Sequence, residues 1–474
     1  MCRRASKQEA PFPWRQCIVL ALCNAAHFYT ICSLFSYAGF LVVDLGWAAD
    51  VDGAGYVAGY LGSALVVGRL FTSVLWGHLA DRCGRKPAIL LSMAGILVGN
   101  LVFGVTKTLH AALAARAFFL GACNGWVSLM GVYVGEVGGA SRQNRVNGYT
   151  LTGGTFTQLA GPAVAALLYN KIPAYPALAP SLLGALLAFL AIGLGTLWLT
   201  ETKEPGYSLV GDEQPEPHVS DIHSALFMRG VFLRFALGFA TFASFDTIPL
   251  WAIASTRAGG LELTRMQLAI VLTVASGFQV LYSLFVMASF MERRGLRGSL
   301  VTAACAGALV LSCIPFFGVL ATIPFAVQLV FLSIPVTVFY GAATTAFSSA
   351  QAIVNNVVRS SERGYANGVA VTVEAVGKAS GPTFGAVVLA TGFATHPGLI
   401  GAGAAFWCLA LSLLGAVAVA RKLPQSVEDS LDDAFETIEM TRKKEVDFDE
   451  GSDAWDAKVG KRDSEKALAA LDAA

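Results

Sequence analysis

Long apolar stretches separated by short polar segments run through this chain of 474 residues. A membrane-spanning helix needs about 20 mostly apolar residues, and twelve stretches satisfy that requirement. They lie at residues 17–43, 54–76, 88–106, 111–135, 148–169, 177–200, 230–255, 267–290, 299–320, 325–352, 365–392 and 398–420. The pattern predicts an all-α membrane protein with twelve transmembrane helices. The tenth and eleventh stretches are rich in Ser, Thr, Asn and Gly, and polar spans usually face protein or water.

The longest internal polar segment, 201–228, lies between the sixth and seventh apolar stretches and contains three prolines. We interpret it as a linker between two six-helix bundles. This predicts a cytoplasmic N-terminus at 1–16, a first bundle at 17–200, a cytoplasmic linker at 201–228, a second bundle at 229–420 and an acidic cytoplasmic tail at 421–474.

The two predicted halves share sequence features. Asn147-Gly148 and Gly161-Pro162 recur as Asn367-Gly368 and Gly381-Pro382, both at an offset of 220 residues. The loop sequence GHLADRCGRK at 77–86 is also echoed by ASFMERRGLR at 288–297, which aligns Asp81 with Glu292 and Gly84 with Gly295. Duplicated membrane halves are typical of transporters whose substrate site lies at the midplane between them. The repeat therefore predicts two pseudo-symmetric bundles.

Composition supports a membrane location. Hydrophobic residues make up 55 % of the chain and charged residues 14 %, whereas soluble domains carry about 25 % charged residues. This excludes an ordinary soluble enzyme, a nucleic-acid binder and a disordered protein. The predicted inward segments hold 16 basic residues against 4 in the outward loops, and basic residues mark the cytoplasmic side. Both termini are therefore expected to be cytoplasmic.

Charge is unevenly distributed between the body and the end of the chain. Residues 421–474 contain 9 basic and 15 acidic residues, whereas the rest of the chain contains 24 basic and 17 acidic residues. We expect the acidic tail to make no direct contribution to transport.

Motifs for enzymatic chemistry are absent from the sequence. It has no GK[ST] phosphate-binding loop, no HExxH and no Cys/His metal-binding cluster, the patterns that would indicate an ATPase or a metallohydrolase. We therefore expect no catalytic residues, no cofactor and no bound metal. The expected partners are a small-molecule substrate, protons and the lipid bilayer, with no nucleic acid, and the expected state is a monomer.

Several motifs resemble those of the major facilitator superfamily. Residues 77–86 match the family's loop motif between spans two and three at nearly every position. Arg116, followed five residues later by Gly121, resembles its fourth-span motif, and Gly161-Pro162 resembles its fifth-span antiporter motif. That last match is partial, because Ala165-Ala166 stands where the family has a glycine pair. The resemblance covers residues 14–422 and implies the major facilitator fold.

Further residues resemble the zinc-induced-facilitator-like and tetracycline/proton-antiporter-like branch. They are PWRQ at 13–16, Gly68-Arg69, Asn124-Gly125, Phe245-Asp246-Thr247, Gly259-Gly260-Leu261 and Lys378-Ala379. This resemblance implies proton-driven antiport of small organic molecules or metal chelates, in a plasma membrane or a vacuole-type membrane.

Gating residues are expected in the loop motif and in the fifth span. A carboxylate at a helix end can pair with an arginine or with the N-terminus of a neighbouring helix, and Asp81 lies at such an end. Alternatively, the basic residues of the loop serve only as anchors at the inner leaflet. The predicted gating residues are Asp81, Arg82, Gly84, Arg85, Gly161 and Pro162.

Ionisable residues inside predicted spans are costly and usually functional. We predict Asp246 as the proton carrier, Arg116 as a charge that lowers the proton affinity of an acid, and Glu374 with Lys378 as a switch in which protonated Glu374 releases Lys378 for an anionic substrate group. The alternatives are a structural hydrogen bond for Asp246 or Arg116, and mutual neutralisation of Glu374 and Lys378, which lie four residues apart.

Polar residues in other spans are candidates for substrate binding. A stripe in the tenth span recurs at steps of three and four residues, which places it on one helix face. His27, with Asn24 and Thr30 within one turn, is either a hydrogen-bonded filler or a ligand. Arg69 is expected to have a structural role. The predicted substrate-binding residues are His27, Asn124, Tyr340, Thr344, Ser348 and Gln351.

Together these patterns predict a secondary active transporter that works by alternating access, with proton antiport as its coupling. A uniporter or proton symporter of the same fold, and a membrane receptor that does not transport, remain the alternatives.

Overall fold

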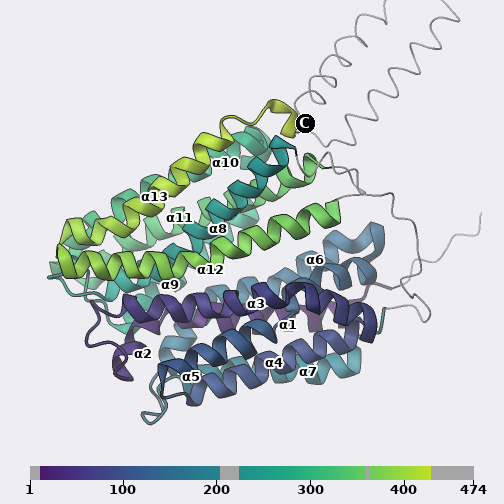
Figure 1. The fold of residues 1–474 in the computed structure, drawn as a ribbon, viewed down its shortest axis with the longest axis horizontal. Helices are drawn as coiled ribbons and strands as arrows, with labels where there is room; N and C mark the ends of the chain where they lie inside the picture. The colour runs from purple at the N-terminus through teal and green to yellow at the C-terminus, as the bar shows by residue number, and fades with distance from the viewer. Residues whose placement is uncertain (1–10, 203–223, 359–362, 429–474) are drawn as a thin grey trace, which may run out of the picture. The chain divides into compact units, whose positions relative to one another are not determined.

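The computed structural model describes residues 11–202, 224–358 and 363–428 (Figure 1). Most of the predicted N-terminal segment, most of the predicted linker and nearly all of the acidic tail lie outside these described residues. The described part of the chain is helical and contains no β-strand. It therefore agrees with the all-α prediction.

The helices of the first part of the chain are α1 (Trp14–Phe35), α2 (Ala38–Asp44), α3 (Gly55–Cys83), α4 (Arg85–Val105), α5 (Leu109–Ala114), the π-helix η1 (Ala115–Ala122), α6 (Trp126–Leu168) and α7 (Leu178–Trp198). Those of the second part are α8 (Ala225–Ile253), α9 (Arg265–Phe285), α10 (Met287–Cys313), the 3₁₀-helix η2 (Ile314–Thr322), α11 (Phe325–Asn356), α12 (Arg363–Thr395), α13 (Leu399–Ala420) and the 3₁₀-helix η3 (Gln425–Glu428).

Among the described residues, ten helices are long and apolar enough to cross a membrane. They account for ten of the twelve predicted spans. The other two, 148–169 and 365–392, fall on the second part of α6 and on α12, which are helical but more polar. The eleventh stretch was expected to be polar on sequence grounds, whereas the fifth was not.

Several predicted boundaries between spans differ in detail from the observed helices. The first predicted span, 17–43, consists of two helices, because a turn at residues 36–37 separates α1 from α2. Gly139 and Gly295 have φ values of 58° and 71° and break α6 and α10 into two parts each. Glycine adopts such left-handed conformations without the steric cost that a Cβ brings.

The chain divides into two compact units, which we call the first unit and the second unit. The first unit comprises residues 1–34 and 71–208, and the second comprises residues 35–70 and 209–474. The predicted bundle boundary at 201–228 stays a prediction, since most of that segment is not described. The grouping places α2 and the first part of α3 with the second unit.

Apolar side chains from α1, α4, α6 and α7 form the core of the first unit. Leu20, Met93, Trp126 and Ala188 are buried in it, and α4 packs along α7 (Figure 1). In the second unit α8 packs along α12 and α13, while α10 packs along α11 and α13. Each unit therefore has its own packed interior, within which polar side chains must find partners.

Candidate functional site

The loop motif lies in the first unit, where a sharp corner joins α3 to α4. Gly84 separates the two helices and has a φ of 98°. A Cβ at this position would also collide with the carboxylate of Glu201. The positive φ therefore favours glycine here, and a larger residue would also displace the Glu201 carboxylate.

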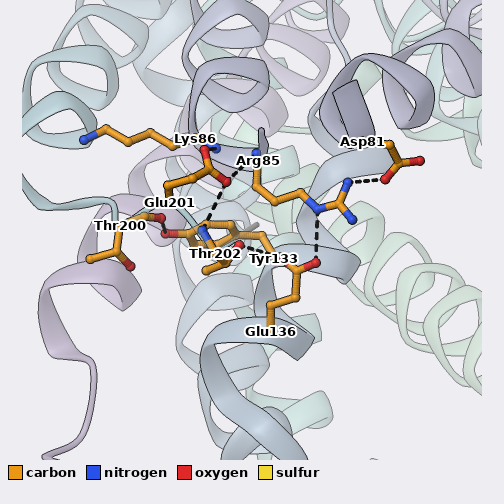
Figure 2. Close-up of polar contacts among 8 residues, drawn as sticks. All are labelled: Asp81, Arg85, Lys86, Tyr133, Glu136, Thr200, Glu201 and Thr202. Carbon is orange, nitrogen blue, oxygen red and sulfur yellow. Dashed lines mark hydrogen bonds and ion pairs between the residues drawn. The ribbon is translucent and has the colours of Figure 1, made fainter. Parts of the chain in front are cut away.

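Glu201 caps the N-terminus of α4. Its two carboxylate oxygens accept the backbone N–H groups of Arg85, at 2.8 Å, and Lys86, at 3.2 Å (Figure 2). The first N–H groups of a helix have no partner within the helix, and they attract negative charge. On sequence grounds, Asp81 could pair either with an arginine or with a helix N-terminus. In the structure Asp81 pairs with the Arg85 side chain, and Glu201 occupies the helix N-terminus.

Arg85 connects two acidic side chains. Its guanidinium pairs with Asp81 on α3 and donates through Nε to Glu136 on α6, at 3.0 Å (Figure 2). Glu136 also accepts the hydroxyl of Thr202. Arg82 is exposed on the last turn of α3. The loop motif is thus tied to α6 and to the segment after α7.

Two acidic residues of this cluster, Glu136 and Glu201, were missed by the sequence analysis. Neither belongs to the loop motif, because they stand 51 and 116 residues after Arg85. The sequence offered one signal for Glu201, which is its position. It is the first charged residue after the sixth apolar stretch.

A similar corner occurs within α10 of the second unit. Gly295 has a φ of 71°, and the carboxylate of Glu428 accepts the backbone N–H groups of Leu296 and, at 2.9 Å, Arg297. The Arg297 guanidinium donates to the carbonyl of Arg421 at 2.7 Å, as the Lys86 ammonium donates to the carbonyl of Thr196 at 2.8 Å. The aligned Gly84 and Gly295 therefore have the same conformation and the same kind of cap.

A second group of polar residues is buried where α8 packs against α12. Gly377, Gly381 and Gly385 stand four residues apart on α12, and a Cβ on any of them would collide with Phe235, Phe239 or Thr247 of α8. Small residues at this spacing let two membrane helices approach closely. The close approach brings acidic and basic side chains of the two helices together.

Asp246 lies on α8 and is 1 % exposed. Its carboxylate packs against Gly62 of α3, where a Cβ would lie 2.7 Å from Oδ2. The hydroxyl of neighbouring Ser244 donates to the carbonyl of Ala240 at 2.7 Å. A narrow cleft beside Asp246 is lined by residues of α2 and by Phe35 and Ser36 at the break between α1 and α2.

Glu374 on α12 has two basic partners. Lys378 pairs with one of its oxygens, as the spacing of four residues predicts, and Arg234 of α8 pairs with the other, with its Nε at 2.6 Å. The side chains of Arg234 and Glu374 are only 7 % and 6 % exposed, whereas that of Lys378 is 23 % exposed. The sequence analysis missed Arg234, so Glu374 and Lys378 do not form an isolated neutral pair.

Gln351 extends this cluster to α11. Its amide oxygen accepts the guanidinium of Arg234, and its amide nitrogen donates to Asn355 at 3.2 Å and Asn367 at 2.6 Å. Arg69 of α3, which was expected to be structural, interacts electrostatically with Glu374. The cluster therefore draws on α3, α8, α11 and α12 of the second unit.

Aromatic rings line the face of the second unit that carries Lys378. The Lys378 ammonium lies 5.0 Å from the ring centroid of Phe242 and 5.3 Å from that of Phe347, distances at which a cation is attracted to a ring face. On the predicted stripe of α11, Tyr340 packs edge-on against Phe245, with ring centroids 5.3 Å apart.

The remaining members of the stripe lie on the same helix. Gln279 of α9 donates to the Thr344 hydroxyl at 3.0 Å, and Thr344 donates to the carbonyl of Tyr340 at 2.9 Å. Ser348 is half-buried one turn further along α11. Gln351, further along the stripe, contacts the buried guanidinium of Arg234.

The first unit brings together two of the predicted substrate-binding residues. His27 is 1 % exposed, and its Nδ1 lies 3.0 Å from the side-chain nitrogen of Asn124. Asn24 and Thr30, the expected neighbours of His27 within one turn, accept hydrogen bonds from Trp126 at 2.9 Å and Asn100 at 3.0 Å. A role for His27 and Asn124 in binding substrate stays a prediction.

Arg116 lies in the π-helix η1 and is 2 % exposed. Its guanidinium is 5.4 Å from the ring centroid of Phe103 on α4. π-Helical turns are rare and occur frequently at functional sites. Gly161 and Pro162 lie inside the second part of α6, where a Cβ on Gly161 would make ordinary contact with Tyr29. Their predicted roles, in coupling and in gating, are not tested by these contacts.

Comparison with known proteins gives a consistent result. Residues 17–382 match a family model described as Major Facilitator Superfamily. The chain is 28 % identical over 403 residues to Protein ZINC INDUCED FACILITATOR-LIKE 1 of Arabidopsis thaliana, a match that covers 78 % of this chain and 82 % of that protein. It is also 26 % identical over 220 residues to the Major facilitator superfamily multidrug transporter mfsB of Aspergillus fumigatus, covering 42 % and 36 % of the two chains.

Among solved structures, the D-xylose-proton symporter matches with a TM-score of 0.70 at 14 % sequence identity, covering 89 % of this chain and all of that chain (100 %). At this identity the match shows the fold alone. Together the matches confirm the fold and the superfamily that the sequence resemblance implied, and a zinc-induced-facilitator-like protein is among the similar proteins.

Proposed function

This chain belongs to the major facilitator superfamily, a family of membrane transporters and not of enzymes, and we propose that it exchanges protons for a small organic molecule or a metal chelate. In this proposal alternating access moves the substrate, and Asp246 carries the proton. The observation that carries the proposal is a buried carboxylate packed against a glycine of another membrane helix.

Burial makes Asp246 suitable as a proton carrier. An ionised carboxylate inside a membrane protein is costly unless it is paired, and protonation removes that cost. Asp246 also contacts α3 at Gly62, and the same helix carries Asp81 of the loop motif near its other end. A shift of α3 would therefore change the surroundings of the proton site and of the proposed gate together.

The names of similar proteins support export of a small molecule, the direction in which a proton antiporter would move it. The multidrug transporter mfsB is one such relative, and an Efflux pump azaK of Aspergillus niger is another. The Gly161-Pro162 pair, which resembles the antiporter motif, supports the same direction of coupling. We further propose a monomer with both termini in the cytoplasm, in a plasma membrane or a vacuole-type membrane.

The test uses purified protein in proteoliposomes that carry a proton gradient. Internal pH is recorded while lipophilic cations, tetracycline-like compounds, organic acids and metal chelates are added in turn. We expect substrate-dependent proton release down the gradient, and Asp246→Asn should abolish it while leaving folded protein. Asp50→Asn, at an exposed aspartate of the same unit, is the matched control. Unchanged flux in Asp246→Asn would remove Asp246 from the mechanism.

A symporter is the second candidate function, and the contacts of Glu374 favour it. Protonation of Glu374 would weaken its hold on Lys378 and release the ammonium for an anionic substrate group. Proton and substrate would then bind together and move in the same direction. In the proteoliposome assay, co-uptake of protons with substrate identifies the symporter, and substrate uptake without proton movement identifies a uniporter.

A further inference from the structure

Positive charge exceeds negative charge in the membrane interior of the second unit. Around the single carboxylate of Glu374 the structure gathers Arg234, Lys378 and, by longer-range interaction, Arg69. Within the described membrane helices of this unit, the other buried acid is Asp246. Even if Asp246 is ionised, three cations face two carboxylates. An uncompensated charge in a membrane protein is costly, so this cluster favours the arrival of a further anion.

The basic side chains are held to different degrees. Arg234 is fixed from two helices, because it pairs with Glu374 of α12 and donates to Gln351 of α11. Lys378 pairs with Glu374 on its own helix, yet keeps 23 % of its side chain exposed. Its flexible stem lets the ammonium turn toward a new partner without moving a helix. Lys378 is thus the cation best placed to meet a ligand.

The surroundings of Lys378 also indicate the rest of the ligand. The rings of Phe242 and Phe347 both lie close to its ammonium. Both rings are half-buried, as are Tyr340 and Phe245 on the same helices. Ligand sites are commonly apolar and aromatic, with a few polar groups that fix orientation. An apolar or aromatic body suits such a lining.

We propose that the second unit binds an organic anion, with the Lys378 ammonium contacting its anionic group and with Phe242 and Phe347 packing against an apolar or aromatic body. Arg234 is a positioning residue in this arrangement, since it holds Glu374 in place while Lys378 turns to the ligand. The inference rests on the proposed function as a transporter and names its substrate class. It requires no particular direction of proton movement.

The test compares three probes with the same aromatic body and different charge. They are 1-naphthoate, 1-naphthylmethanol and 1-naphthylmethylammonium, titrated calorimetrically into the full-length protein in lipid nanodiscs. We expect 1-naphthoate to bind about tenfold or more tightly than the neutral alcohol, because a charge-assisted contact is stronger than a neutral one. Equal binding of all three probes, preference for the ammonium, or no binding of 1-naphthoate would overturn the proposal.

Variants identify the contact. Lys378→Gln should lower the affinity for 1-naphthoate about tenfold, whereas Lys378→Arg should retain most of it. Lys422→Gln, at an exposed lysine of the same unit, is the matched control. Phe347→Leu leaves every charge in place and should weaken binding of 1-naphthoate several-fold, which keeps the test decisive if Lys378→Gln does not fold. Unchanged affinity in folded Lys378→Gln or in Phe347→Leu would count against the proposal.

The two proposals fail separately. Anion binding in nanodiscs requires no transport, so binding without flux in proteoliposomes would contradict only the proposed function. Proton-coupled flux of a cation by a protein that does not bind 1-naphthoate would contradict only this inference.

Discussion

The corner at Gly84 in the first unit and the corner at Gly295 in the second unit are built alike but carry different charges. Both use a glycine with positive φ, and both cap the following helix with a glutamate, Glu201 or Glu428. Only the first corner has an arginine directly after its glycine. Arg85 connects Asp81 to Glu136 there, whereas the second corner has Leu296.

This difference separates what the fold requires from what the first unit adds. Backbone N–H groups at a helix start need partners wherever the helix begins, so both corners keep their glutamates. Partly exposed ion pairs contribute about 0–1 kcal/mol to stability, so the pairs made by Arg85 do little to hold the corner together. The role of Asp81 as a gate stays a prediction.

The largest effect on stability is expected at the two glycines. Gly84→Ala forces a Cβ into a left-handed conformation and into Glu201, and should destabilise the protein by about 1–3 kcal/mol. Gly295→Ala should also destabilise the protein, but by less. A Cβ at position 295 would lie 2.8 Å from Glu428, which is farther than a Cβ at position 84 would lie from Glu201. Thermal unfolding of the purified variants measures both.

Matched controls for these variants exist in the same repeat. Gly148 and Gly368 lie in helices, and a Cβ added at either position would meet open space. Gly148→Ala and Gly368→Ala should leave the unfolding temperature unchanged or raise it, because alanine favours helix more than glycine does. Equal losses at corner and control positions would contradict the account of the corners.

A smaller effect is expected from removal of the caps. Glu201→Ala and Glu428→Ala each leave two backbone N–H groups without their carboxylate, and each should cost about 1 kcal/mol. Because the two caps have the same geometry, the losses measured by thermal unfolding should be similar. A loss at one corner only would show that the corners are not equivalent in energy.

The smallest effect on stability, and the sharpest difference between the corners, is expected at their acids. Asp81→Asn breaks a partly exposed ion pair and should cost less than about 1 kcal/mol. If Asp81 is a gate, the variant should slow turnover in proteoliposomes more than it weakens substrate binding. Glu292→Gln changes the aligned, exposed acid of the second corner and should leave turnover unchanged. Weaker binding with normal turnover in Asp81→Asn would contradict the gate.

Hydropathy predicted most of the fold because the bilayer imposes it. Spans must be long, apolar and helical to satisfy their backbone in lipid, and the predicted spans fall on helical segments, although some, such as 17–43 and 111–135, are divided between successive helices. The break between α1 and α2 was not predicted, since no proline stands near Ser36 and Tyr37 and the nearby Gly39 lies within α2, in a long apolar stretch that reads as one span. The π-helix around Arg116 was missed for a similar reason, because no residue type marks it.

The sequence by itself determined what depends on short spacings along the chain. These features are the spans, the glycine corner of the loop motif and the pair of Glu374 with Lys378, because residues four apart on a helix meet whatever surrounds it. Only the tertiary structure decided which distant side chains join them. Arg234 reaches Glu374, Glu201 reaches the start of α4, and Gly62 meets Asp246. Each pair comes from separate helices or segments, and only the packing of those segments brings the two residues together.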